Sequence, residues 1–197
     1  KLKSKRTGVF IDIDNTLYQG LSQVDFVLYL LKLHKIKWGQ ALGIFKWLFL
    51  EKTHLVPHST MMQGALTVLK GWDAGELSHH AHSFFNKQAL PQLHYGLFPV
   101  LEDHSAQGHT IVFVSEVIHP LAKEFGKFFK ASATLDTKLE EEGGHYTGEV
   151  GTLSYGQRKA DLIKRYATRA HIDLSKSFAY ADSESDIPFL KLVGHPT

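Results

Sequence analysis

The segment GVFIDIDNTLYQG, residues 8–20, constrains the fold more than any other part of this chain. It begins as a run of apolar residues, which is typical of a short strand that is buried on both faces. Asp12 and Asp14 then stand where the strand should end. Side chains two positions apart on an extended chain point the same way, so both carboxylates are predicted to face one site.

Other segments repeat this pattern of an apolar strand followed by polar residues. They are TIVFVS at 110–115, SFAYAD at 177–182 and, more weakly, ASATLD at 131–136. Helical patterns lie between them at residues 99–108, 119–130 and 158–170. Alternation of strands and helices predicts an α/β fold, with a Rossmann-like parallel sheet core flanked by helices.

Residues 19–96 interrupt the alternation and have the pattern of helices almost throughout. Ser22 with Asp25, and Asp73 with Glu76, have the spacing of capping boxes at helix starts. We therefore expect an inserted, all-helical cap subdomain. The predicted division is a Rossmann-like core of residues 1–18 and 97–197 and a helical cap of residues 19–96. The glycines of EEEGGHYTGEVG, residues 140–151, predict a small hairpin at the rim of the sheet.

Composition limits the partners and the compartment. The net charge of +2 gives no reason to expect a nucleic-acid partner. The absence of cysteine excludes disulfides and thiolate metal sites and fits a reducing compartment, so we expect a cytoplasmic protein.

The longest apolar stretch, residues 38–50, is interrupted by Gln40 and Lys46 and is shorter than the roughly 20 residues of a membrane span. It predicts a buried or half-buried helix, and we do not expect membrane association. An interfacial membrane helix is the alternative, because such helices favour aromatic residues. The cap aromatics that we expect in a helix core rather than around a substrate are Phe26, Tyr29, Trp38, Phe45 and Trp47.

Polar side chains at the strand ends predict a ligand site. In open α/β sheets ligands bind beyond the carboxyl ends of the strands, where Asp12, Asp14, Ser115 and Asp182 all fall. Ionised carboxylates that lie close together repel each other, and a divalent cation relieves that repulsion. Mg²⁺ prefers carboxylate oxygens together with substrate phosphate, so Asp12 and Asp182 are candidate ligands.

Further residues complete a candidate phosphate pocket. Asp186, four residues after Asp182, and Ser183 are expected to support the metal ligands from behind. Ser115 offers a hydroxyl, and Lys159 brings positive charge at the start of a helix. A hydroxyl, an ammonium and a metal ion together are typical of a phosphate site.

DIDNTL, the serine of VFVSE, the lysine of GQRKADLI, and DSESD occur in the order and approximate spacing of four motifs of the haloacid dehalogenase-like superfamily. Within it the chain resembles the phosphoserine-phosphatase-like branch, which has a helical cap between the first and second motifs. The resemblance extends over nearly all of the second half of the chain. It implies a Mg²⁺-dependent phosphatase that hydrolyses a small phosphomonoester through an aspartyl-phosphate intermediate.

The resemblance also implies a role for each residue. Asp12 would attack phosphorus, and Asp14 would protonate the leaving alcohol and then deprotonate the hydrolytic water. Thr16, Ser115 and Lys159 would hold the phosphoryl oxygens. The implied metal ligands are Asp12, the backbone carbonyl of Asp14, and Asp182.

The chain departs from the branch at several positions. Glu116 follows the motif serine where relatives have a small residue, so it either turns to solvent or places an acid beside the phosphate pocket. Phosphoserine phosphatases have a glutamate that reads the substrate amino group where this chain has Leu21. We therefore expect a less charged or more apolar alcohol than serine. Arg158 competes with Lys159 as the motif lysine, and Asn15 replaces a glycine.

Two alternatives to a phosphatase remain. A phosphotransferase would use the same intermediate but a different acceptor. A catalytically silent phosphate-binding or signalling domain is suggested by Glu116, whereas Asp14 and the long insertion argue against it. The chain ends at GHPT, where relatives continue into a further strand, so we expect the C-terminus to be incomplete. The physiological substrate and the oligomeric state stay open.

Overall fold

The computed structural model describes residues 6–197, so residues 1–5 of the predicted core segment lie outside the described residues. Within that range six strands form one sheet in the order β4-β3-β2-β1-β5-β6. The strands are β1 (Gly8–Ile11), β2 (Thr110–Ile118), β3 (Ala133–Glu142), β4 (His145–Thr152), β5 (Phe178–Tyr180) and β6 (His195–Pro196). β4 runs antiparallel to β3, and the other neighbours are parallel. The predicted α/β class is confirmed.

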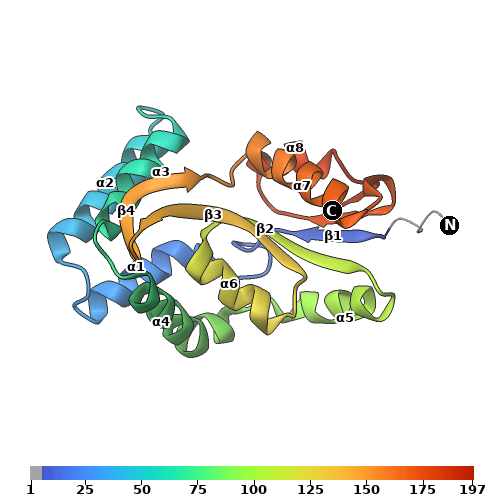
Figure 1. Ribbon diagram of the computed structural model, residues 1–197, viewed down its shortest axis with the longest axis horizontal. Helices are drawn as coiled ribbons and strands as arrows, with labels where there is room; N and C mark the ends of the chain where they lie inside the picture. The colour runs from blue at the N-terminus through green and yellow to red at the C-terminus, as the bar shows by residue number, and fades with distance from the viewer. Residues whose placement is uncertain (1–5) are drawn as a thin grey trace.

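Helices cover both faces of the sheet and gather at one end of it. The helices are α1 (Ser22–Lys32), α2 (Trp38–Lys52), α3 (His58–Leu66), α4 (Ala74–Phe84), α5 (Phe98–Ala106), α6 (His119–Phe128), α7 (Gln157–Ala170) and α8 (Ile187–Leu190). In Figure 1, α5 and α6 lie on one side of the sheet and α7 and α8 on the other. Helices α1 to α4 gather beyond the end at which β1 stops (Figure 1).

The central strand β1 is buried throughout, as its unbroken apolar sequence predicts. It pairs in parallel with β2 on one side and with β5 on the other. The amide of Asp12 still donates to the carbonyl of Tyr180, at 3.0 Å, one residue beyond the strand. The chain therefore delivers the Asp12 side chain to the carboxyl edge of the sheet.

Strand β2 is longer than predicted. We expected it to end at Ser115, but it continues to Ile118 because Val117 and Ile118 are also apolar and buried. Its register with β3 shifts between Val114 and Ile118, which is typical of a bulge. Bulges re-aim side chains, and here the irregular stretch contains Ser115 and Glu116.

The predicted small hairpin is larger than expected and contacts the inserted helices. Strands β3 and β4 have ten and eight residues and are joined at Gly143 and Gly144, both with positive φ. Gly71 donates to the carbonyl of Tyr146 on β4, at 2.8 Å. The side-chain amide of Gln63 on α3 also donates to a β4 carbonyl, at 2.9 Å. The hairpin thus supports α3 and the segment that follows it.

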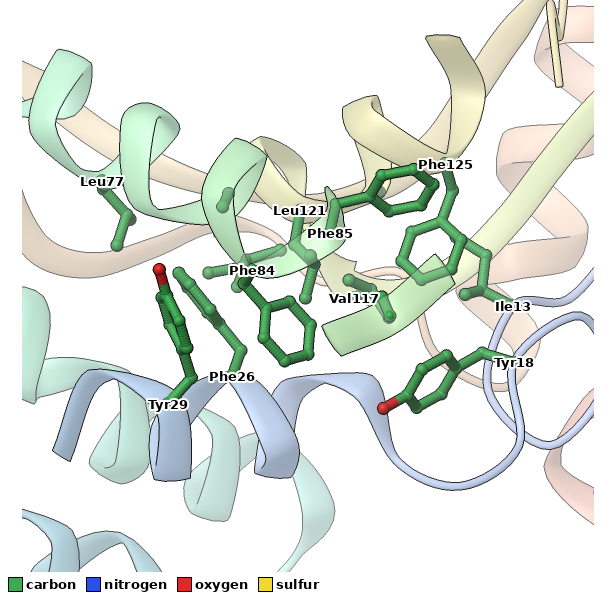
Figure 2. Close-up of a cluster of buried hydrophobic side chains, with 14 of the residues drawn as sticks. Ile13, Tyr18, Phe26, Tyr29, Leu77, Phe84, Phe85, Val117, Leu121 and Phe125 are labelled. Atoms are coloured by element: carbon green, nitrogen blue, oxygen red, sulfur yellow. The ribbon is translucent and has the colours of Figure 1, made fainter. Parts of the chain in front are cut away.

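Helices α1 and α4 share a hydrophobic core with the sheet and α6, as Figure 2 shows. Phe26 of α1 lies 5.4 Å from Phe84 of α4, measured between ring centroids. Phe85 meets Phe125 of α6 edge to face at 5.0 Å, and Phe125 meets Tyr18 in the same way at 6.0 Å. Burial of each such ring contributes roughly 1.5–3 kcal/mol. These helices are therefore firmly attached to the sheet.

The two predicted helix caps differ in outcome. Asp73 caps α4 as expected, because its side chain accepts from the amide of Glu76 at 2.8 Å. The capping box at Ser22 is wrong: Ser22 is the first helical residue, and the N-cap residue Leu21 makes no side-chain capping bond. The carboxylate of Asp14 accepts from the Ser22 amide instead, at 3.0 Å, and so satisfies that end of α1.

The expected packing of the cap aromatics in a helix core is wrong at Trp38, and Phe26 and Phe45 pack in the core but also line a cavity between α1, α2 and α3. Phe26 and Tyr29 are buried, and Phe45 and Trp47 are half-buried. Trp38 is 77% exposed and lies with Leu42 and Phe49 on the outer face of α2. Across residues 6–197, none of the helices has the length and hydropathy that crossing a bilayer requires.

Candidate active site

Three charged side chains that lie far apart in the sequence meet at the carboxyl edge of the sheet. Asp12 follows β1, Lys159 belongs to α7, and Asp186 lies just before α8. The ammonium of Lys159 donates to Oδ1 of Asp12 and to Oδ1 of Asp186, each at 2.7 Å. The three residues are 5%, 3% and 1% exposed, respectively. A buried lysine thus bridges two buried carboxylates.

The start of α7 explains why Lys159, and not Arg158, enters this cluster. Gly156 precedes the helix with φ 53° and ψ −128°, a conformation that strongly favours glycine. The following turn directs Lys159 inward, where its ammonium also lies 5.7 Å from the ring of Phe189. Arg158 is exposed.

The carboxylates fit a divalent metal ion. One oxygen from each of Asp12, Asp182 and Asp186 lies within 4.8 Å of the others. Oδ2 of Asp186 is buried without a hydrogen-bond partner. Hard oxygen donors in this number suit Mg²⁺, which often uses one or two carboxylates and keeps several waters. The side chain of Asp186 makes no capping bond to α8 and instead belongs to this cluster.

The charge balance of the cluster favours an added cation. Burial raises the pKa of Asp12 to about 7, although Lys159 opposes this rise and the charge of Asp186 adds to it. Burial tends to lower the pKa of Lys159, but the two carboxylates hold it above its ordinary value. Lys159 therefore stays charged, whereas the raised pKa of Asp12 shows that the negative charge of this acid is unfavourable here, a cost that a bound cation relieves.

Asp14 lies beside this cluster in a different environment. Burial raises its pKa to about 6, the hydrogen bond from Ser22 opposes this, and the charge of Glu116 contributes to the rise. A carboxyl group with this pKa can exchange a proton near neutral pH, which suits general acid–base chemistry. Asn15 follows with φ 54°, in the left-handed region that asparagine tolerates.

The remaining predicted site residues are placed as follows. The hydroxyl of Thr16 donates to Oδ1 of Asp182 at 3.3 Å, so these two residues are brought together. Ser115 is buried, and its hydroxyl accepts from the amide of Val117 at 3.3 Å. Ser183 turns away into its own loop, where its hydroxyl lies 2.9 Å from that of Ser185.

Glu116 has a partner that we did not predict. Nε2 of His58, the first residue of α3, lies 2.7 Å from Oε1 of Glu116, and Nδ1 lies 3.3 Å from Oε1 of Glu51. The His58 ring stacks on Tyr155 with centroids 3.6 Å apart. Burial tends to lower the pKa of His58, but the hydrogen bonds to Glu116 and Glu51 raise it overall. Glu116 is half-buried and paired with His58, and it lies beside Asp14, whose pKa its charge helps to raise. Of the two expectations for Glu116, an acid beside the site is the one that the structure supports.

Sequence reasoning missed His58 because nothing local marks it. It lies 58 residues from Glu116, and a histidine that follows a proline at a helix start is an ordinary surface pattern. Only the packing of α3 against the sheet brings the two side chains together.

A cavity of about 260 Å³ opens beside Asp14 and extends between α1, α2 and α3. Its polar lining residues are Asp14, Gln23, Glu51, His58 and Glu116, and most of the others are apolar. Leu21 is among the apolar lining residues, and it stands at the position where the family resemblance implies a glutamate.

The chain is similar to curated phosphatases. Phosphoserine phosphatase SerB1 of Mycobacterium tuberculosis is 27% identical over 192 residues, which cover 95% of this chain and 62% of the relative. This chain thus spans about three fifths of that protein. The histidinol-phosphatase of Neisseria meningitidis is 23% identical over 202 residues, or 98% of this chain and 89% of the relative.

Solved structures share the fold. A Bordetella pertussis protein of unknown function superposes with a TM-score of 0.89 at 21% identity, covering 98% of this chain and 89% of its own. A substrate-bound phosphoserine phosphatase superposes with a TM-score of 0.71 at 15% identity, covering 100% and 86%. Residues 9–191, which hold both strand-end acids and the buried lysine, match the family model for haloacid dehalogenase-like hydrolases. The chain therefore belongs to the haloacid dehalogenase-like hydrolase family.

Proposed function

We propose that this protein is a Mg²⁺-dependent phosphatase that hydrolyses a small phosphomonoester through an aspartyl phosphate on Asp12. The observation that carries the proposal is the buried cluster of Asp12, Lys159 and Asp186, with Asp14 beside it at the end of β1. Family membership and the phosphatase names of the relatives support the same reaction.

In the first step a carboxylate oxygen of Asp12 attacks phosphorus, and the bond from phosphorus to the ester oxygen breaks. Asp14 gives its proton to the departing alcohol oxygen, which its raised pKa allows. The phosphoryl oxygens are held by Lys159 and by the hydroxyls of Thr16 and Ser115.

In the second step Asp14, now a carboxylate, takes a proton from a water molecule. The water oxygen attacks phosphorus, the bond from phosphorus to Asp12 breaks, and inorganic phosphate leaves. The separate environments of the two acids fit this division, because Asp12 contacts Lys159 whereas Asp14 contacts the start of α1.

The residues that would hold Mg²⁺ are Asp12, Asp182 and the backbone carbonyl of Asp14, with Asp186 supporting them. When bound, the ion supplies positive charge that offsets the charge of the phosphoryl oxygens. The Thr16 hydroxyl donates to the Asp182 carboxylate when no substrate is bound and would turn its proton to a phosphoryl oxygen in the complex.

We also propose that residues 19–96 act as a cap over the core formed by the flanking segments. The helices of this segment lie beyond the carboxyl end of β1 (Figure 1). Residues of α2 and α3 line the cavity beside Asp14. A cap in this position shields the reaction from bulk water and selects the leaving group.

Phosphate release from a generic aryl phosphate tests the proposal, with Mg²⁺ and with a chelator. We expect Asp12→Asn to lower the rate with Mg²⁺ by at least about a thousandfold, since it removes the nucleophile. Asp161→Asn, an exposed change on α7, is the matched control and should leave the rate unchanged. Equal rates for wild type and Asp12→Asn would refute the mechanism.

The alternatives make distinct predictions. A phosphotransferase would transfer the phosphoryl group to added alcohol acceptors, which product analysis detects. A catalytically silent domain would release no phosphate. Glu116 suggests that alternative, but its carboxylate is paired with His58. The exposed Trp38, Leu42 and Phe49 favour the membrane-surface alternative, which flotation with anionic vesicles tests. The phosphatase proposal needs no membrane and predicts turnover of soluble esters without vesicles.

A further inference from the structure

The cavity beside Asp14 is lined mainly by hydrocarbon. Helix α1 contributes Phe26 and Leu30, α2 contributes Ile44 and Phe45, and α3 contributes Met61 and Met62. Among its described lining residues there is no lysine or arginine. Ligand pockets of this kind obtain most of their binding energy from apolar contact and use a few polar groups for orientation.

Asp14 connects this cavity to the chemistry. It lines the cavity, and under the proposed function it protonates the oxygen of the leaving alcohol. The carbon atoms attached to that oxygen must therefore start beside Asp14. Under the same mechanism the phosphoryl group would lie against Asp12 and Lys159, neither of which lines the cavity, so the cavity is space available to the alcohol.

The charged side chains that line this cavity disfavour a polar amino-acid substrate. Among the described lining residues His58 is the only side chain that can carry positive charge near neutral pH, and it already contacts Glu51 and Glu116. A substrate carboxylate would meet Asp14, Glu51 and Glu116 without a free cation, and burying it would be costly. A substrate amine would have to displace His58 from these acids.

We propose that the substrate is the phosphate monoester of an apolar, chain-like alcohol, whose hydrocarbon lies between α1, α2 and α3. This inference rests on the proposed function and specifies its leaving group. Met61 and Met62 suit a flexible chain, because methionine side chains adapt to irregular apolar shapes. Leu21, at the edge of the same cavity, extends the apolar path.

The test is a series of butyl, hexyl and octyl phosphates, each used as a monomer below its micelle-forming concentration. We expect kcat/KM to rise about three- to fourfold per added methylene until the cavity is filled, which is the factor for burying one methylene. Phosphoserine should be a poorer substrate than butyl phosphate. A flat or falling series, or phosphoserine as the best substrate, would overturn the inference.

A cavity-filling variant assigns the effect to this site. Ala65→Phe places a ring in the cavity and should lower the ratio of kcat/KM for octyl to ethyl phosphate by at least about tenfold. Ala106→Phe, on the exposed end of α5, is the control and should leave that ratio unchanged. Met62→Gln, which keeps the length of the side chain, is a second variant with the same expected direction if Ala65→Phe does not fold. An unchanged ratio in the folded variant contradicts the inference.

The two proposals fail in different ways. If neither aryl nor alkyl phosphates release phosphate with Mg²⁺, the proposed function is wrong. If aryl and short alkyl phosphates are hydrolysed without any dependence on chain length, only the apolar substrate class is wrong.

Discussion

At the scale of residues, the site is organised around one buried lysine between two buried carboxylates. An ion pair in the interior contributes little net stability, but removing one partner leaves the others unpaired and is expensive. Lys159 therefore holds Asp12 in position, although apolar side chains in place of these charged groups would make the fold more stable.

Lys159→Met should lower the free energy of unfolding by about 3–5 kcal/mol, because it leaves Asp12 and Asp186 without their buried cation. Arg158→Met, the exposed neighbour, should change it by less than about 0.5 kcal/mol. Urea unfolding of both variants measures the difference. A similarly small loss of unfolding free energy in both variants would contradict the proposed importance of the buried charge cluster.

At the scale of elements, α3 is connected to the sheet through His58. Its imidazole contacts Glu116 of β2 and Glu51 of α2 and stacks on Tyr155, which precedes α7. Sequence patterns predicted the helices themselves, since the periodicity of apolar residues is a local signal. They could not predict this link, because it depends on how distant elements pack.

The His58 contact should make stability depend on pH. Since the pKa of folded His58 lies above its ordinary value of 6.5, the ion pair contributes fully below about pH 6.5 and is lost as the pH rises through the folded pKa. His58→Gln should therefore cost about 1 kcal/mol more at about pH 6 than at about pH 9. Urea unfolding at both pH values measures this.

The control for that prediction is a double-variant cycle. In a Glu116→Gln background most of the pH-dependent difference should disappear, and the part that remains belongs to Glu51. An equal cost of His58→Gln at both pH values would show that its role is packing alone.

At the scale of the whole molecule, the parallel strands of the core and the position of the strand-end acids were predictable. Apolar runs ending in acids, separated by helical patterns, indicate parallel strands whose carboxyl ends share one edge. The length of β2, the reach of the β3–β4 hairpin and the exposure of Trp38 were not predictable. Each depends on contacts with elements that are distant in the sequence. Local sequence patterns carry no information about those contacts.

Metal binding should stabilise the whole fold, since Asp12, Asp182 and Asp186 lie close enough to share one ion and burial disfavours the ionised form of Asp12 without it. Saturation with Mg²⁺ at about 100 times its Kd would add about 2.7 kcal/mol. That corresponds to a rise in Tm of roughly 5–10 °C for a chain of this size. Asp182→Asn should remove most of this rise, whereas Asp161→Asn should keep it. A Tm that is independent of Mg²⁺ in the wild type would argue against the site.

The proposed mechanism requires that a phosphoryl group becomes bonded to Asp12 and that Asp14 controls its release as phosphate. An aryl phosphate has a good leaving group that needs little protonation, so Asp14→Asn should slow the second step more than the first. Rapid acid quenching of Asp14→Asn with Mg²⁺ and an aryl phosphate, followed by peptide mass spectrometry, measures the intermediate directly. We predict a phosphoryl group on the peptide that contains Asp12, approaching one per protein molecule. Continued release of the aryl alcohol with that peptide unmodified would contradict the account.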